Sequence, residues 1–252
     1  MFKTLHKYAS PMHFYALAAT CSPWLFWLSA VLLLTGLYGG LILAPADYQQ
    51  GESFRIIYVH VPSAWLSMFA YLVMASAGAA SLIWKVKLGD VIARASAPLG
   101  ASFTALALAT GSLWGKPMWG AWWVWDARLT SELLLLFLYL GYLALQSAID
   151  DRRAAARAGA VLAVVGVVNI PIIHYSVDWW STLHQPATIT KLGAPSMATS
   201  MLIPLLIMAL AYQLFYFAVL LVRARCEILE FEKRAQWVKT LAIAHSAARK
   251  IS

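Results

Sequence analysis

The sequence predicts an all-α fold: a polytopic membrane protein with six transmembrane helices. Composition is the first reason, because 62% of the 252 residues are hydrophobic and 12% are charged, whereas roughly a quarter of a soluble domain is charged. The second reason is that the chain contains six long apolar runs, and crossing the hydrocarbon core takes about 20 apolar residues in a helix. Together these observations exclude a soluble globular domain.

Four of the runs contain no Asp, Glu, Lys or Arg: residues 24–44, 61–84, 95–113 and 197–222. The other two are interrupted, since residues 129–148 contain Glu132 and residues 158–177 contain Asn169 and Pro171. We expect the outer ends of these two helices to be buried in protein or to line a wet cavity. The first run has no convincing small-residue cleavage pattern and is predicted to be an uncleaved anchor.

The distribution of basic residues predicts the orientation. Cytoplasmic loops are enriched in Lys and Arg, and one face of this topology holds all of the nineteen except Arg55, Lys116, Arg128 and Lys191. Both termini are therefore expected in the cytoplasm, with a bacterial inner membrane as the setting. The outer loops are predicted at about 45–60, 114–128 and 176–196, and a cytoplasmic tail at 223–252.

No linker or internal repeat divides the chain, so residues 1–252 are predicted to form one domain. The topology explains the net charge of +8, which therefore indicates contact with membrane lipid and no nucleic acid partner. Cys21 and Cys226 both fall on the predicted cytoplasmic side, and they form neither a CxxC motif nor a disulfide framework.

Five of the twelve tryptophans lie in the second outer loop: Trp114, Trp119, Trp122, Trp123 and Trp125. Tryptophans at the ends of transmembrane helices often form interfacial belts, but this density exceeds what anchoring requires. Tryptophan offers a wide π-face and an N–H that prefers a wet boundary, so the cluster suits a flat amphiphilic ligand at the bilayer edge. Haem b, iron protoporphyrin IX, is the leading candidate.

Two outer histidines, His60 and His184, are candidate metal ligands, because imidazole is a common axial ligand of haem iron. If residues 178–184 are helical, Trp180 shares a face with His184. Arg55 and Arg128 are candidate partners for the haem propionates, since guanidinium binds carboxylate through paired hydrogen bonds. The residues alone leave His174 open as a competing ligand.

Two acidic residues lie beside the cluster. Asp126 is expected to cap the fourth transmembrane helix, although it could instead pair with Arg128 or orient a ligand from the second shell. Glu132 is a candidate buried partner for an outer arginine.

Several segments resemble the haem exporter protein C family, CcmC, of cytochrome c maturation. The tryptophan-rich sequence of residues 119–130 carries the strongest resemblance, and it is joined by residues 44–50, 55–62, 115–118 and 169–180. The resemblance extends from about residue 44 to residue 185. It implies that His60 and His184 are the axial ligands and that residues 114–126 receive the porphyrin and dock a chaperone.

Membership of that family would imply that the protein holds haem at the periplasmic face and transfers it to a periplasmic haem chaperone. The implied partners are the ATPase and membrane subunits of an ABC transporter and a small membrane adaptor subunit. The role would be binding and delivery, not enzymatic turnover.

Three other functions compete with this prediction. The transmembrane helices could conduct haem or another solute across the bilayer, although four of the six runs lack the ionisable residues that normally mark a pathway. The aromatic loop could be a docking scaffold that binds no haem, since tryptophan is enriched at binding hot spots. A zinc or copper site has less support, because no Cys or HxxxH arrangement accompanies the histidines.

Overall fold

The computed structural model describes residues 10–184 and 194–249. Apart from one isolated bridge between Asp47 and Gly51, the regular structure of these residues is helical, which confirms the predicted all-α fold. The elements are α2 Pro11–Tyr38, the π-helical turn η1 Gly39–Leu43, the 3-10 helix η2 Glu52–Ile56, α3 Ile57–Trp84, α4 Lys87–Trp119, α5 Ala127–Ala148, α6 Arg152–Gly166, α7 Asn169–Trp179, α8 Thr199–Phe231 and α9 Gln236–Arg249.

Six helical segments among the described residues are long and apolar enough to cross a membrane, as predicted. Several extend well beyond the apolar runs: α2 begins at Pro11, α4 spans Lys87–Trp119, and α8 continues to Phe231. The predicted boundaries are too short because hydropathy marks the hydrocarbon core, whereas a helix can continue into the polar boundary. Residues 114–119 are therefore helical, and the second outer loop begins only at Gly120.

The fifth segment is broken between α6 and α7, at Val167 and Val168. Pro171 explains the break, because proline has no N–H to donate and its ring clashes with the carbonyl four residues earlier, that of Val167. That carbonyl instead accepts a hydrogen bond from the Ile170 N–H at 3.0 Å. Asn169, at the start of α7, is buried and its Nδ2 donates to the Ser131 carbonyl of α5 at 2.9 Å. The break is thus fixed against the neighbouring helix.

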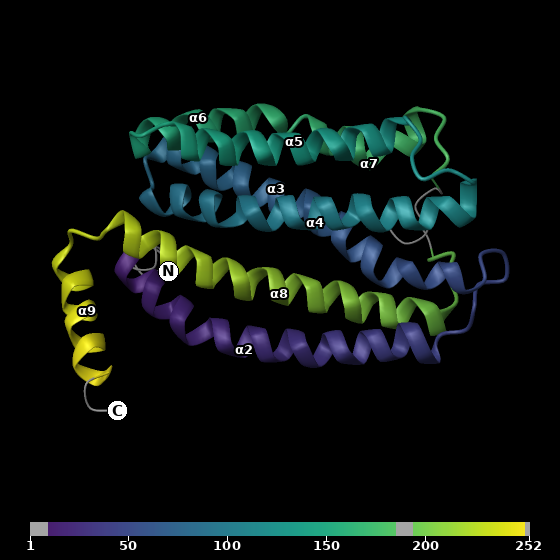
Figure 1. The fold of residues 1–252 in the computed structure, drawn as a ribbon, viewed down its shortest axis with the longest axis horizontal. Helices are drawn as coiled ribbons and strands as arrows, with labels where there is room; N and C mark the ends of the chain where they lie inside the picture. Colours follow the sequence, from purple (N-terminus) through teal and green to yellow (C-terminus); the bar gives the residue numbers. More distant parts are fainter. Residues whose placement is uncertain (1–9, 185–193, 250–252) are drawn as a thin grey trace.

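The helices form three layers (Figure 1). Helices α2 and α8 lie side by side, α3 and α4 form the middle layer, and α5, α6 and α7 lie on its other side. Helix α2 begins and α8 ends at one end of the bundle, which we call the terminal end. Helix α4 ends and α5 begins at the opposite end, which we call the loop end.

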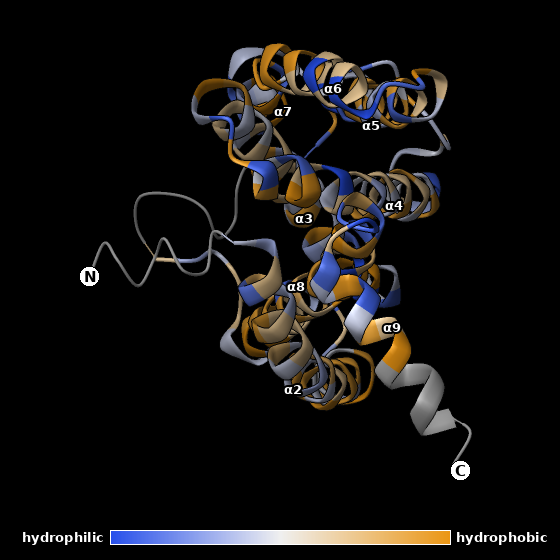
Figure 2. Ribbon diagram, turned by 90° about the vertical axis from the view of Figure 1, so that its left-hand side faces the viewer, coloured by the Kyte–Doolittle hydropathy of each residue, from blue (hydrophilic) through white to orange (hydrophobic). Residues whose placement is uncertain are grey.

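Helix α2 turns apolar side chains outward from the bundle, and much of its ribbon is orange or tan in Figure 2. Exposed side chains follow this helix along its length, among them Trp24, Trp27 and Leu34, which are 77%, 70% and 69% exposed. Such a surface is stable against lipid and would be unfavourable in water. This agrees with a multi-pass membrane protein.

Small residues let the middle layer pack closely against α5 and α6. Gly100 of α4 lies against Tyr139 of α5, whose ring is fully buried and whose hydroxyl donates to the Ser67 carbonyl of α3 at 2.7 Å. Gly78 of α3 approaches Ala160 of α6, leaving only 3.1 Å for an added Cβ. Small residues at such crossings are typical of helices that associate within a bilayer.

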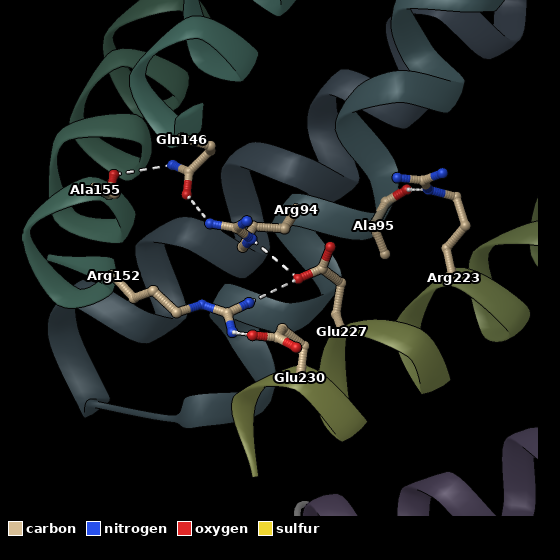
Figure 3. A network of polar contacts seen from close by, with 8 residues as sticks. All are labelled: Arg94, Ala95, Gln146, Arg152, Ala155, Arg223, Glu227 and Glu230. Carbon is tan, nitrogen blue, oxygen red and sulfur yellow. Dashed lines mark hydrogen bonds and ion pairs between the residues drawn. The ribbon is translucent and has the colours of Figure 1, made fainter. Parts of the chain in front are cut away.

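A polar network joins the layers at the terminal end (Figure 3). Glu227 of α8 accepts from Arg94 of α4 and from Arg152 of α6, each at 3.1 Å. Arg94 also donates to Gln146 Oε1 of α5 at 2.6 Å, and Gln146 donates to the Ala155 carbonyl of α6 at 2.9 Å. One carboxylate thereby connects α8 to both other layers.

Candidate functional site

A cavity of about 580 Å³ lies at the loop end, and we call it the loop-end cavity. Its volume is in the range of small-molecule sites. Five of the residues predicted to bind haem line it together: His60, Trp114, Trp119, Arg128 and His184. They come from α3, α4, α5 and the segment that follows α7, so distant parts of the chain converge here.

His60 lies in the first turns of α3, which begins at Ile57 directly after the 3-10 helix η2. Its Nδ1 is 3.0 Å from Thr110 Oγ1 of α4. The Trp114 ring meets the imidazole edge to face, with 5.7 Å between ring centroids. The imidazole is therefore held against α4 by one polar and one aromatic contact, while it lines the cavity.

His184 follows α7 in a non-helical segment, because α7 ends at Trp179. The conditional expectation that Trp180 shares a helical face with His184 therefore fails. The indole beside His184 is that of Trp119, with 5.1 Å between ring centroids. His184 Nδ1 lies 3.5 Å from Asp126 Oδ2, an ion-pair distance that is long for a hydrogen bond.

Asp126 has the capping role expected for it, and it also lies beside His184. Its Oδ1 accepts from the Leu129 N–H at 2.8 Å, which caps α5, and its other oxygen faces His184. Burial alone would raise the pKa of Asp126, but the His184 imidazole and the Leu129 amide hold the pKa of this carboxyl below its ordinary value. The carboxyl is therefore ionised at neutral pH and presents a negative charge to His184.

The tryptophans divide into two groups. Trp114 and Trp119 line the cavity, and Trp114 Nε1 donates to Gln50 Oε1 of the first loop at 2.9 Å. Gly120 ends α4 with a φ of +74°, in the left-handed region that glycine adopts readily. Beyond this turn Trp122 and Trp125 are 55% and 74% exposed and do not line the cavity.

Trp123 is also absent from the cavity lining, and it packs against Trp125 with 5.4 Å between ring centroids. Its Nε1 is buried without a hydrogen-bond partner among the described residues. Lys116 lies over the Trp122 ring at 5.9 Å. The five tryptophans therefore form an inner pair, which lines the cavity, and an outer group of three, which does not.

The two candidate arginines differ in their surroundings. Arg128 lines the cavity, and within the described ranges its guanidinium has no hydrogen bond or ion pair. Arg55 does not line it: Nη1 donates to the carbonyls of Gly40 and Ala44 at 2.8 and 2.9 Å, and Nε pairs with Glu52. Arg55 therefore fastens the end of the first transmembrane segment, while Arg128 is available to a ligand.

Glu132 lies one turn after Arg128 on α5 and also lines the cavity. Its side chain is buried, and Oε1 has no hydrogen-bond partner in the part of the chain that the structure describes. Glu132 therefore interacts with the outer arginine Arg128 through charge alone, without a direct ion pair.

His174 remains a geometric competitor, because it too lines the cavity. Its ring packs edge to face on Tyr175, with 4.7 Å between centroids. It differs from His60 and His184 in lacking a polar partner on the ring among the described residues. Metal-ligating imidazoles almost always have such a partner, so the geometry favours His60 and His184.

Three polar residues that contact or line the site were not predicted: Thr110, Gln50 and Asp178. Thr110 gave a weak signal, as a polar residue inside an apolar run. Its pairing with His60 joins positions 50 apart in the chain and emerges only from the fold.

The fold and the site define a class: a helical membrane protein with a cavity at one end, lined by histidine, tryptophan and arginine. The chain matches the family described as Heme exporter protein C, CcmC, over residues 4–239, and it belongs to that family. Membership gives it a role in haem transport and cytochrome c biogenesis.

Individual relatives agree. Heme exporter protein C of Haemophilus influenzae is 52% identical over 242 residues, which cover 96% of this chain and 98% of the relative. Heme exporter protein C of Escherichia coli K12 is 51% identical over 243 residues, again 96% and 98% of the two chains. A putative cytochrome c biosynthesis ccmC-like mitochondrial protein of Marchantia polymorpha is 47% identical over 174 residues, 69% of this chain and 73% of the relative.

Proposed function

We propose that this protein binds haem b in the loop-end cavity and presents it to a periplasmic haem chaperone. The observation that carries the proposal is the pairing of His60 and His184 on one aromatic cavity. Each imidazole faces a polar group at Nδ1: the Thr110 hydroxyl at 3.0 Å for His60, and the Asp126 carboxylate at 3.5 Å, which is an ion-pair distance without a hydrogen bond, for His184. That arrangement leaves Nε2 as the ligating atom in both, and two such atoms complete the axial coordination of haem iron.

The remaining lining suits the rest of a porphyrin. Trp114 and Trp119 offer flat apolar faces beside the two histidines. Arg128 makes no direct hydrogen bond or ion pair with the described residues, although Glu132, Asp126 and Asp178 act on it electrostatically, and it would pair with a propionate. Arg55 has a structural role in this proposal. Its hydrogen bonds to the carbonyls of Gly40 and Ala44 position the loop whose Gln50 side chain accepts from Trp114.

We place the loop end in the periplasm of a bacterial inner membrane and the terminal end in the cytoplasm. The positive-inside rule supports this, since fifteen of the nineteen Lys and Arg residues fall toward the terminal end of the predicted topology. The loop-end cavity would then face the compartment in which the chaperone resides.

Transfer requires a surface for the chaperone and a way to release haem. Trp122 and Trp125 are exposed next to the cavity and supply large apolar contacts for docking. Binding is tight only while partners are engaged, namely the ATPase and membrane subunits of an ABC transporter and a small adaptor subunit, with ATP-driven movement shifting the cavity between states. The chain itself delivers haem and catalyses no reaction.

The direct test is the visible absorption spectrum of the detergent-purified protein, produced together with its chaperone and transporter subunits. We expect bound haem with a low-spin, six-coordinate spectrum. Protein that carries no haem, and takes up none when haem is added, would overturn the proposal and leave the tryptophan segment as a docking surface.

Arg128 should contribute to haem affinity through the propionates. We expect Arg128→Gln to weaken haem binding by about ten- to a hundredfold, as for loss of a charged hydrogen bond. Titration with haem and with its dimethyl ester, which has no carboxylates, separates this effect from damage to the cavity. Wild type should prefer haem, whereas Arg128→Gln should bind both alike. Equal binding of the two ligands by wild type would contradict the assignment.

A further inference from the structure

We propose that Thr110 is a positioning residue that fixes the tautomer of His60 and so presents its Nε2 to iron. This rests on the proposed function, in which His60 is an axial ligand. His60 Nδ1 and Thr110 Oγ1 are 3.0 Å apart, and distance alone leaves open which of them donates.

Counting protons decides the direction of this hydrogen bond. The Thr110 hydroxyl has one proton, and Oγ1 lies 2.7 Å from the Leu106 carbonyl and 3.2 Å from the Ala107 carbonyl. Carbonyls only accept, so the hydroxyl donates to one of them and has a lone pair left for His60. The proton of the shared bond therefore belongs to His60 Nδ1.

A neutral imidazole carries a single N–H, so a proton on Nδ1 leaves Nε2 with a lone pair. That lone pair is the one a metal requires. In the opposite tautomer Nε2 would carry the proton, and Nδ1 could be satisfied only if the Thr110 hydroxyl turned away from the Leu106 carbonyl and gave up that 2.7 Å hydrogen bond. Thr110 thus selects the tautomer that can ligate.

The packing around the ring supports the same assignment. Gly111 follows Thr110 on α4, and a Cβ at this position would come within 3.1 Å of His60 Cε1. Because α4 approaches so closely, the Nδ1 edge of the His60 ring reaches Thr110. Trp114, one turn further along α4, packs against another side of the same ring. Thr110 is itself buried, so water does not compete readily for the bond.

The two proposed ligands therefore have unequal partners. A carboxylate lies opposite His184, whereas a neutral hydroxyl lies opposite His60. The role of Thr110 is therefore to orient the ring of His60 and to select its tautomer.

The test compares Thr110→Val with Thr104→Val. Valine keeps the shape of threonine and removes the hydroxyl. Thr104 lies on the same helix, is fully buried, and donates to the Gly100 carbonyl at 2.7 Å without a histidine beside it. The control thus reproduces the loss of a hydroxyl bonded to the helix backbone, and Thr110→Ser restores the hydroxyl at the site itself.

We expect Thr110→Val to weaken haem binding roughly tenfold, the low end for an outer-shell partner. It should also increase the high-spin fraction of the bound haem and raise its reduction potential, because the hydrogen bond favours ferric iron. Thr110→Ser and Thr104→Val should keep the wild-type spectrum and potential. If wild type binds haem and Thr110→Val matches Thr104→Val in spectrum and potential, the positioning role is wrong while the haem site stands. If wild type binds no haem, it is the proposed function that fails.

Discussion

Replacing either His60 or His184 by alanine is expected to abolish the low-spin haem spectrum. Each imidazole would supply one axial bond, so either loss leaves five-coordinate, high-spin iron. The affinity for haem should fall by more than roughly 10–100-fold, which is the usual effect of losing only the hydrogen-bond partner of a metal ligand. The absorption spectrum and a haem titration of the purified variants measure both effects, and added imidazole should restore the low-spin spectrum of His60→Gly.

His174→Ala is the matched control, because His174 lines the same cavity without a polar partner on its ring among the described residues. This variant should retain the low-spin spectrum. A low-spin spectrum that survives in His184→Ala and disappears in His174→Ala would replace His184 by His174 in the ligand pair. Survival in both His60→Ala and His184→Ala would remove the two-histidine site altogether.

The second large effect is on stability. A Cβ on Gly100 would overlap the ring and hydroxyl of Tyr139, which is fully buried and donates to the Ser67 carbonyl. We expect Gly100→Ala to lower the free energy of unfolding by about 3 kcal/mol, the upper part of the usual range for overpacked cores. The displaced tyrosine hydroxyl would also lose its hydrogen bond to the Ser67 carbonyl, which adds to the cost.

Gly141→Ala provides the comparison, since it makes the same substitution in α5 where the nearest atom, Leu162 Cδ2, is 3.4 Å from the added Cβ. Alanine there should be neutral or slightly stabilising, because it favours helix more than glycine. Thermal unfolding of both variants in one detergent measures the difference. Equal melting temperatures would contradict the close packing of α4 on α5.

The fold was predictable because hydropathy alone identifies membrane-spanning helices. Hydropathy did not predict the true length of the helices. Helix α4 begins at Lys87 and α8 ends at Phe231, and the outer turns of both contain polar residues. The interruption before Pro171 was visible as a proline within an apolar run. The break itself, at Val167, follows from the geometry of the carbonyl four residues earlier.

The candidate site was predictable only in part. His60, His184 and Arg128 could be named because such residues are conspicuous at the ends of apolar runs, and all three line one cavity. The separation of Trp125 from Trp119 was hidden, because it depends on the chain turning at Gly120. Thr110 was hidden for another reason: an isolated threonine in a helix usually bonds only its own backbone.

The network around Glu227 has a mechanical consequence for the opposite end of the molecule. Helix α8 is joined there to α4 and α6, and it contributes Leu205 to the cavity wall near its other end. About 40 Å of helix separate Glu227 from Thr199, so pivoting α8 by about 5° at the network displaces Thr199 by roughly 3–4 Å. A rigid tilt of α8 about the network would therefore move Leu205 and, with it, one part of the cavity wall.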